Sequence, residues 1–251
     1  MGRGARLHQR FGASPDVLDA LERLASVEDV VDAAGKLVWD MGVPRMSYHF
    51  TPPFYSQTGE RTVIFEHGFP HDWVAKYSDP DFRRADPVPG QVMAAVQPLL
   101  WREAYDRAPQ TEEVLAFKAE AERFKLLDGL GIPLFGPGGR DAYSAYDLDR
   151  PFDLEGDREL IRAIRETAQA AHLRISHLVI QEMNEGAALS MRETEVLSWV
   201  VAGKSGTDIA AILDIAPATV DTYLRRIFAK LDVNDRMKAA LRALSLGLVR
   251  L

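Results

Sequence analysis

The C-terminal end of the chain carries the pattern that most constrains its fold. Ser190 with Glu193, and Ser205 with Asp208, have the spacing of capping boxes, in which two side chains satisfy free backbone N–H groups at the start of a helix. Pro217 suits the first position of a third helix, in which apolar residues recur at helical spacing. Two short helices, a tight turn and a longer helix with a polar outer face form a helix-turn-helix, whose second helix enters the major groove of DNA.

A set of residues at fixed spacing runs through nearly all of this segment. They are Arg192-Glu193-x-Glu195-Val196-Leu197, Gly203-Lys204-Ser205, Ile209-Ala210, Ile212-Leu213, Thr219-Val220 and Lys230-Leu231-x-Val233. In them the segment resembles the DNA-binding module of LuxR-type regulators, the GerE-like helix-turn-helix. The resemblance implies an all-α domain of four helices over residues 189–251 that binds double-stranded DNA. It also implies a homodimer on a pseudo-palindromic promoter site, with RNA polymerase as a further partner.

Three positions around the third helix depart from the usual pattern of that family. Ala216 stands where Ser is usual, Asp221 where a basic or polar residue is frequent, and Tyr223 where His is common. A groove-facing Asp repels phosphate but accepts a hydrogen bond from the amino group of cytosine. Asp221 therefore either changes the DNA sequence that is read or weakens binding.

The outer face of the third helix supplies the expected DNA contacts. Arg225 is the expected base contact, with guanine as its partner, and Asp221 and Thr222 share its face. The expected phosphate contacts are Lys204, Ser205, Thr219, Arg226 and Lys230.

Charge is divided unevenly along the chain. Its net charge is -7, but from Gly186 onward nine Lys or Arg stand against seven Asp or Glu, which leaves +2 at this end and -9 on the rest. The positive end is the one expected to meet phosphate, and its small excess predicts modest, salt-sensitive affinity for non-specific DNA.

The length of the chain favours a two-domain protein. A chain of 251 residues can bury two cores. It contains no recognisable signal peptide and no apolar run of membrane-spanning length, so we expect a cytoplasmic location and no membrane partner. The chain has no Cys, which excludes disulfides and thiolate metal sites.

Strands flanked by helices predict an α+β domain over residues 1–182. We expect an α-β-α sandwich, with an antiparallel sheet between helical layers. Helices are expected from Pro15, capped by Ser14, and again from Ser26. The other expected elements are strands at 45–51 and 61–66 around the turn Ser56–Gly59, strands at 130–135 and 141–146, and helices at 71–77, 91–96, 111–127 and about 153–182. Residues 183–188 are the expected linker.

Six residues of this domain form a pattern that periodicity does not explain. They are Trp73, Tyr77, Asp86, Pro87, Trp101 and Gly129. In them, residues 15–180 resemble the autoinducer-binding domain of LuxR-type quorum sensors, which binds N-acyl homoserine lactones. Taken singly, each residue has a plainer explanation in a core or a turn. The joint pattern favours a ligand site.

The resemblance assigns roles that suit the chemistry of such a lactone. The indole N–H of Trp73 would donate to the ring carbonyl, and the carboxylate of Asp86 would accept from the amide N–H. Tyr77 and Trp101 would form aromatic walls around the lactone and acyl tail. Gly129 would permit close backbone approach beneath the ligand.

Phe69 is the main departure, because the family commonly has Tyr there and its hydroxyl donates to the amide carbonyl. In this chain that carbonyl must find Tyr48, Tyr143, Ser144 or water, or stay unpaired at a cost of about 1–3 kcal/mol. Lys125, where the family tends to have Gly, is a second irregularity. Both indicate either a changed ligand or a pocket that no longer binds one.

The residue pattern gives little indication of a metal site or of an enzyme active site. His67 and His71 are four residues apart, but Gly68 and Pro70 argue against one helix presenting both to a metal. No arrangement of nucleophile, base and orienting group is recognisable, so neither a catalytic residue nor a cofactor is expected.

The leading interpretation is a ligand-responsive transcription factor of quorum sensing whose signal stabilises the fold and favours a dimer. Two alternatives stay open. One is a sensor that acts by pairing with a related regulator; the other is a regulator with a different signal, such as an aryl-acyl lactone or a non-lactone metabolite, or with none. Apolar residues of the final helix serve either the dimer or the module's own core: Ala239, Ala240, Leu241, Leu244 and Leu248.

Overall fold

The computed structural model describes residues 15–51, 62–186 and 189–249. Ser14 and the predicted turn Ser56–Gly59 lie outside these ranges. The chain divides into two compact units, an N-terminal one that contains the sheet and a C-terminal one that contains the last four helices. Within the described ranges, no helix combines the length and the hydropathy that a membrane-crossing segment needs.

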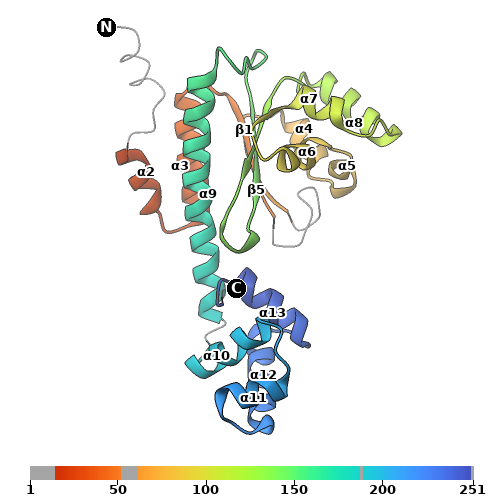
Figure 1. Cartoon of the computed structure of the whole chain (residues 1–251). Coiled ribbons are helices and arrows are strands. Elements are labelled where there is room, and N and C mark those ends of the chain that lie inside the picture. Colours follow the sequence, from red (N-terminus) through yellow and green to blue (C-terminus); the bar gives the residue numbers. More distant parts are fainter. Residues whose placement is uncertain (1–14, 52–61, 187–188, 250–251) are drawn as a thin grey trace. The chain divides into compact units, whose positions relative to one another are not determined.

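A five-stranded antiparallel sheet forms the middle of the N-terminal unit (Figure 1). In spatial order its strands are β2 (Val63–His67), β1 (Arg45–Phe50), β5 (Ala142–Asp147), β4 (Leu130–Leu134) and β3 (Leu99–Leu100). His49 pairs with Tyr143 across β1 and β5, and the neighbouring residues Tyr48 and Ser144 pair in the same way. Because side chains alternate along a strand, these two pairs face opposite sides of the sheet.

Helices α3 (Val27–Asp40) and α9 (Arg158–Gly186) cover one face of this sheet, with α2 (Pro15–Glu22) beside α3 (Figure 1). Ser26 begins α3 by accepting a hydrogen bond from the backbone N–H of Asp29. Both helices bury apolar side chains: Val30, Val31, Ala34, Val38, Ile164, Ala168 and Ile175. The backbone of α9 stays helical through residues 183–186 of the expected linker, and residues 187–188 lie outside the described part.

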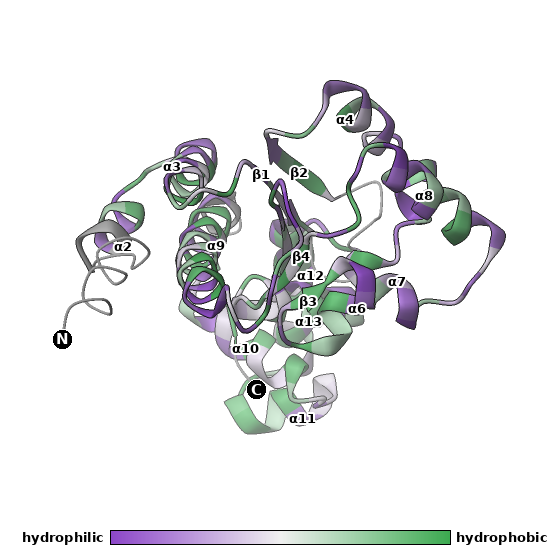
Figure 2. Ribbon diagram, turned by 90° about the horizontal axis from the view of Figure 1, so that it is seen from above, coloured by the Kyte–Doolittle hydropathy of each residue, from purple (hydrophilic) through white to green (hydrophobic). Residues whose placement is uncertain are grey.

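Five short helices cover the other face: α4 (His71–Tyr77), α5 (Pro80–Arg84), α6 (Val88–Ala95), α7 (Trp101–Arg107) and α8 (Glu112–Arg123). The view along the strands in Figure 2 shows α3 and α9 on one side of the sheet and α4, α6, α7 and α8 on the other. The predicted α+β class, with an antiparallel sheet between helical layers, is therefore confirmed.

Several elements differ from the sequence prediction. Helices α5 and α7 and strand β3 were not predicted, because such short elements show no periodicity. Helix α6 begins at Val88 rather than near Gln91. Helix α8 ends at Arg123, well before the predicted Leu127, because Lys125 adopts a left-handed φ of 61° that no helix can continue through.

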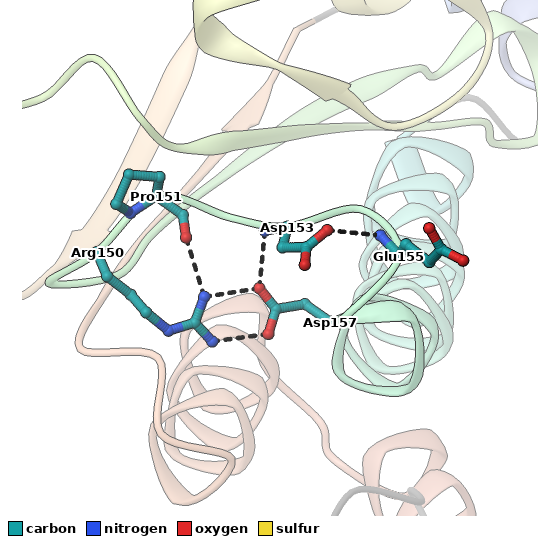
Figure 3. A network of polar contacts seen from close by, with 5 residues as sticks. All are labelled: Arg150, Pro151, Asp153, Glu155 and Asp157. Atoms are coloured by element: carbon teal, nitrogen blue, oxygen red, sulfur yellow. Dashed lines mark hydrogen bonds and ion pairs between the residues drawn. The ribbon is translucent and has the colours of Figure 1, made fainter.

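Helix α9 begins at Arg158, later than the predicted Asp153, and a polar network explains the delay (Figure 3). Arg150 donates two hydrogen bonds of 2.7 Å to the two carboxylate oxygens of Asp157. The same carboxylate accepts the backbone N–H of Asp153, whose own carboxylate accepts the N–H of Glu155. These side-chain bonds hold residues 154–157 in turns, so the regular helix starts only after them.

The C-terminal unit consists of α10 (Met191–Val201), α11 (Gly206–Leu213), α12 (Pro217–Leu231) and α13 (Arg236–Ser245). Both predicted capping boxes are present, Ser190 with Glu193 and Ser205 with Asp208, and Pro217 begins α12. The helices share one core, which includes Val196, Leu197, Val200, Ile209, Val220, Ile227 and Leu231. The predicted all-α helix-turn-helix is confirmed.

Candidate functional site

A cavity of about 340 Å³ lies between the sheet and helices α4 to α8. Its lining includes six residues that the sequence had singled out: Phe69, Trp73, Tyr77, Asp86, Trp101 and Tyr143. The volume, and a wall that combines aromatic side chains with a few polar ones, suit a small organic ligand that carries an apolar tail.

Asp86 is the most unusual group in this cavity. The Tyr77 hydroxyl donates a hydrogen bond of 2.6 Å to one carboxylate oxygen, and the backbone N–H of Val88 donates one of 2.9 Å to the other. Burial nevertheless raises the pKa of Asp86 to about 6, and these two hydrogen bonds oppose the rise. A carboxylate in this state gains from any further N–H donor that enters the cavity.

Trp73 lies at the centre of an aromatic cluster. Its ring stacks on Tyr77 at a centroid distance of 5.7 Å and meets Phe82, Phe117 and Phe124 at 5.6 to 5.8 Å. Trp73 is buried, yet it lines the cavity. The cluster therefore holds the indole rigidly in the wall.

Gly129 and Pro87 shape the site without lining it. A Cβ at Gly129 would lie 2.5 Å from the Trp101 ring, so only glycine lets that indole pack against the backbone here. The Gly129 carbonyl also accepts the backbone N–H of Trp101 at 2.9 Å. Pro87 precedes the first residue of α6, where the Asp86 carboxylate caps the helix.

Of the three residues predicted to replace the missing hydroxyl of Phe69, the structure brings only Tyr143 to the cavity. Tyr48 and Ser144 lie on the opposite face of the sheet. There the Tyr48 hydroxyl and Nδ1 of His172 are 2.8 Å apart and share a hydrogen bond. The sequence had left the three candidates open because it does not fix which face of β1 and β5 meets the ligand.

The cavity lining also contains residues that were not predicted from the sequence, among them Ser47, His49, Arg83 and Tyr105. Alternation along β1 places Ser47 and His49 on one face, but the helices that cover that face were needed to identify it. Burial lowers the pKa of His49 to about 3, with a further contribution from the Arg83 charge, so its ring is neutral. Arg83 belongs to α5, whose start does carry a local signal that the prediction did not use: Asp79 accepts the backbone N–H of Asp81, and Pro80 is the first helical residue.

The surface of the C-terminal unit carries the predicted DNA contacts. On α12, Asp221, Arg225 and Arg226 are exposed, and Thr219 and Thr222 are half-buried. Arg225 donates a hydrogen bond of 3.3 Å to the Thr222 hydroxyl, which in turn donates to the Ala218 carbonyl.

The remaining predicted phosphate contacts have structural roles as well. Lys230 donates a hydrogen bond of 2.7 Å to the buried carboxylate of Glu193, which ties α12 to α10. Ser205 caps α11 through Asp208, and the Lys204 carbonyl accepts a hydrogen bond from Arg236. Lys204 and Ser205 are exposed.

A cavity for a small molecule in one unit and a helix-turn-helix in the other define the class of ligand-responsive DNA-binding regulators. The model of the autoinducer binding domain matches residues 26–175, and that of bacterial regulatory proteins of the luxR family matches residues 187–243. The chain belongs to this family and is a LuxR-type quorum-sensing transcriptional regulator with an autoinducer-binding domain.

Similar proteins agree with this assignment. The quorum sensing-dependent transcriptional regulator RpaR of Rhodopseudomonas palustris is 34% identical over 96% of this chain and 94% of its own length. The transcriptional activator TraR of Agrobacterium vitis is 30% identical over 79% of this chain and 85% of its own. These relatives are named as regulators of transcription, not as enzymes. The crystal structure of Escherichia coli SdiA has the same fold, with a TM-score of 0.71 at 20% identity over 93% of this chain and 96% of that one.

Proposed function

We propose that the cavity binds an N-acyl homoserine lactone or a related acyl or aryl lactone. The observation that carries the proposal is the buried carboxylate of Asp86, with its pKa near 6 and a cavity in front of it. This carboxylate would accept the amide N–H that every such signal carries. Trp73, which has only a donor to offer, suits the carbonyl of the lactone ring.

The remaining wall matches the rest of the molecule. Tyr77, Phe117 and Trp101 offer flat apolar surface to a lactone ring and an acyl tail. Pro87 and Gly129 act indirectly: Pro87 links Asp86 to the first residue of α6, and Gly129 leaves room for the Trp101 ring.

Ligand binding has a physical route to regulation in this protein. Without ligand, the N-terminal unit holds a carboxylate that burial disfavours and a cavity that lacks packing partners. A lactone that satisfies both stabilises the folded unit in proportion to ln(1 + [L]/Kd). The signal therefore increases the folded population that is available to dimerise and bind DNA.

We further propose that a homodimer presents two copies of α12 to a pseudo-palindromic promoter site. Arg225 would read a guanine, with Asp221 and Thr222 beside it, while Lys204, Ser205, Thr219, Arg226 and Lys230 would approach phosphates. On α13, Ala239 is fully buried in the module's own core, whereas Leu241 is 41% exposed and Met237 74%. The exposed pair supplies apolar surface for the dimer.

The deciding experiment is a thermal melt of the purified protein with butanoyl, hexanoyl, octanoyl, dodecanoyl and benzoyl homoserine lactones. Each variant is compared with its own ligand-free melt. We expect at least one lactone to raise the melting temperature, and we expect Trp73→Phe and Asp86→Asn to reduce that rise. A folded wild-type protein that responds to none of these compounds would exclude the lactone signal.

A second candidate function is a sensor that pairs with a related regulator and lacks specific DNA binding of its own. The exposed carboxylate of Asp221 on α12 favours it, because this charge repels phosphate. Selection of random-sequence DNA by the ligand-bound protein separates the two functions. An enriched palindrome supports the homodimeric regulator, and a failure to enrich any sequence while lactone binding persists supports the second candidate.

A further inference from the structure

The cavity lacks a donor at the place where Phe69 stands. Phe69 lines the wall next to α4, and its ring offers no hydrogen bond to an amide carbonyl. If Asp86 takes the amide N–H of the signal, the carbonyl on the other side of that amide would remain unpaired. A buried carbonyl without a partner is costly, so another cavity residue has to supply the hydrogen.

The structure makes special room for a tyrosine on the sheet side of the cavity. Tyr143 projects from β5 and is only 2% exposed. A Cβ at Gly131, on the neighbouring strand β4, would lie 2.8 Å from Cε2 of Tyr143 and 2.4 Å from a methyl carbon of Val92. Only glycine at position 131 leaves space for this ring and for α6 together.

A second side chain is arranged around the Tyr143 hydroxyl. The indole N–H of Trp101 is buried and has no hydrogen-bond partner among the described residues. This N–H lowers the pKa of Tyr143, against the larger effect of burial, which indicates that the two groups are close. Their geometry nevertheless does not meet the criteria for a hydrogen bond. A small adjustment would let Trp101 donate to the Tyr143 oxygen, which would leave the Tyr143 proton aimed at a ligand.

The hydroxyl keeps its proton at neutral pH. Burial, and after it the nearby charge of Asp86, raise the pKa of Tyr143 well above its ordinary value. Asp86 raises the pKa of Tyr105 in the same way, so the observations that single out Tyr143 are the space left by Gly131 and the unpaired N–H of Trp101.

We propose that Tyr143 donates the hydrogen bond to the amide carbonyl of the signal, in place of the hydroxyl missing at Phe69, and that Trp101 orients it. The inference rests on the proposed lactone signal. It assigns the amide two protein partners, Asp86 for its N–H and Tyr143 for its carbonyl. In this receptor the carbonyl therefore points to the sheet and not to the segment before α4.

The test measures the Kd of the best-binding lactone of the panel for wild type, Tyr143→Phe, Tyr146→Phe and the double variant Phe69→Tyr/Tyr143→Phe. Tyr146 is the matched control, because it loses the same hydroxyl from the same strand but lies on the face of the sheet away from the cavity. We expect Tyr143→Phe to raise the Kd roughly tenfold and Tyr146→Phe to leave it nearly unchanged. The double variant should recover most of the affinity, because Phe69→Tyr returns a donor to the opposite wall.

The other outcomes are also decisive. Wild-type affinity in Tyr143→Phe, with affinity lost in Asp86→Asn, would overturn this inference and leave the lactone signal standing. A Tyr143→Phe protein that melts lower without ligand and is not rescued by Phe69→Tyr would reduce Tyr143 to a packing role. If the wild-type protein binds no lactone, the proposed function itself fails and the inference fails with it.

Discussion

Burial of Asp86 makes the stability of the folded protein depend on pH. Its pKa of about 6 in the folded protein lies above the ordinary 3.8, so the folded state holds the proton more tightly than the unfolded chain does. The stability that this preference contributes is fully present below pH 3.8 and is lost as the pH rises through about 6. At neutral pH, the ligand-free protein therefore carries a destabilising buried charge.

We accordingly expect ligand-free Asp86→Asn to be more stable than wild type at pH 7, by up to about 3 kcal/mol. The gap should close as the pH falls towards 4. Urea unfolding of both proteins at a series of pH values measures it. Asp147, whose pKa burial also raises to about 6, is common to both proteins and cancels in the difference. A gap that does not change with pH would contradict the buried-charge account.

The backbone conformation of Lys125 also lowers the stability of the folded protein. Its φ of 61° is a left-handed conformation that a side chain with a Cβ adopts reluctantly, and the side chain itself is exposed. This accounts for the irregularity in the sequence, since glycine suits the residue that ends a helix in this way. Lys125→Gly should stabilise the protein by roughly 0.5–1 kcal/mol in urea unfolding, without changing lactone affinity. Lys125→Ala, which keeps the Cβ, is the control and should give little gain.

At the scale of elements, the ion pair between Lys230 and Glu193 joins α12 to α10. The Glu193 side chain is 4% exposed, so loss of Lys230 would leave a nearly buried carboxylate with the Ser190 backbone N–H as its remaining donor among the described residues. We expect Lys230→Met to lower the unfolding free energy of the C-terminal unit by about 1–2 kcal/mol. Arg225→Ala, on the exposed face of the same helix, should leave stability unchanged.

Measurements of DNA binding distinguish these two variants further. Arg225→Ala should lose discrimination at one base pair of each half-site at all temperatures. Lys230→Met, which removes one proposed phosphate contact, should bind all sequences about equally more weakly at low temperature and should lose binding as the unit unfolds. Filter binding with matched and mismatched sites at two temperatures, with circular dichroism alongside, distinguishes the two variants. Wild-type affinity of folded Lys230→Met at low temperature would remove Lys230 from the phosphate contacts.

The helices and strands also show which elements can be predicted from the sequence alone. Capping boxes and helical periodicity located α10, α11 and α12 closely, because those signals are local. Strands β1 and β2 were predicted as a pair by alternation, and β4 and β5 as a hairpin around the glycine-rich segment at residues 136–139. Helices α5 and α7 were not predicted because they are five and seven residues long, too short to show a helical period. The Asp79 cap and Pro80 could have indicated the start of α5, whereas α7 has no side-chain cap at its start.

The sequence predicted several of the residues that line the cavity, but not the geometry in which they are arranged. The joint pattern of Trp73, Asp86 and Trp101 identified a cavity that the structure contains. The sequence could not choose among Tyr48, Tyr143 and Ser144, because the choice depends on which face of the sheet the short helices cover. Buried polar residues such as His49 and Arg83 were missed, since nothing local separates them from surface residues.

For the whole molecule, the small positive excess of the C-terminal end limits the electrostatic part of DNA binding. Lys230 is partly neutralised by Glu193, which leaves Lys204 and Arg226 as the main proposed cationic phosphate contacts. If a dimer binds, Arg226→Ala should reduce the slope of log K against log salt by about 2, one contact from each subunit. Fluorescence anisotropy with a labelled site at several salt concentrations measures the slope, and an unchanged slope would remove Arg226 from the phosphate contacts.

The glycine at position 131 also constrains how this receptor could have changed its signal over evolutionary time. Because any Cβ there meets both Tyr143 and Val92, a large ring at position 143 is tolerated only after position 131 has become glycine. Shrinking Tyr143 alone would not admit a side chain at position 131, because a Cβ there would still lie 2.4 Å from a methyl carbon of Val92. Lineages selected in the laboratory for a new acyl group should therefore keep Gly131 for as long as they keep either Tyr143 or Val92, so that these three positions change together.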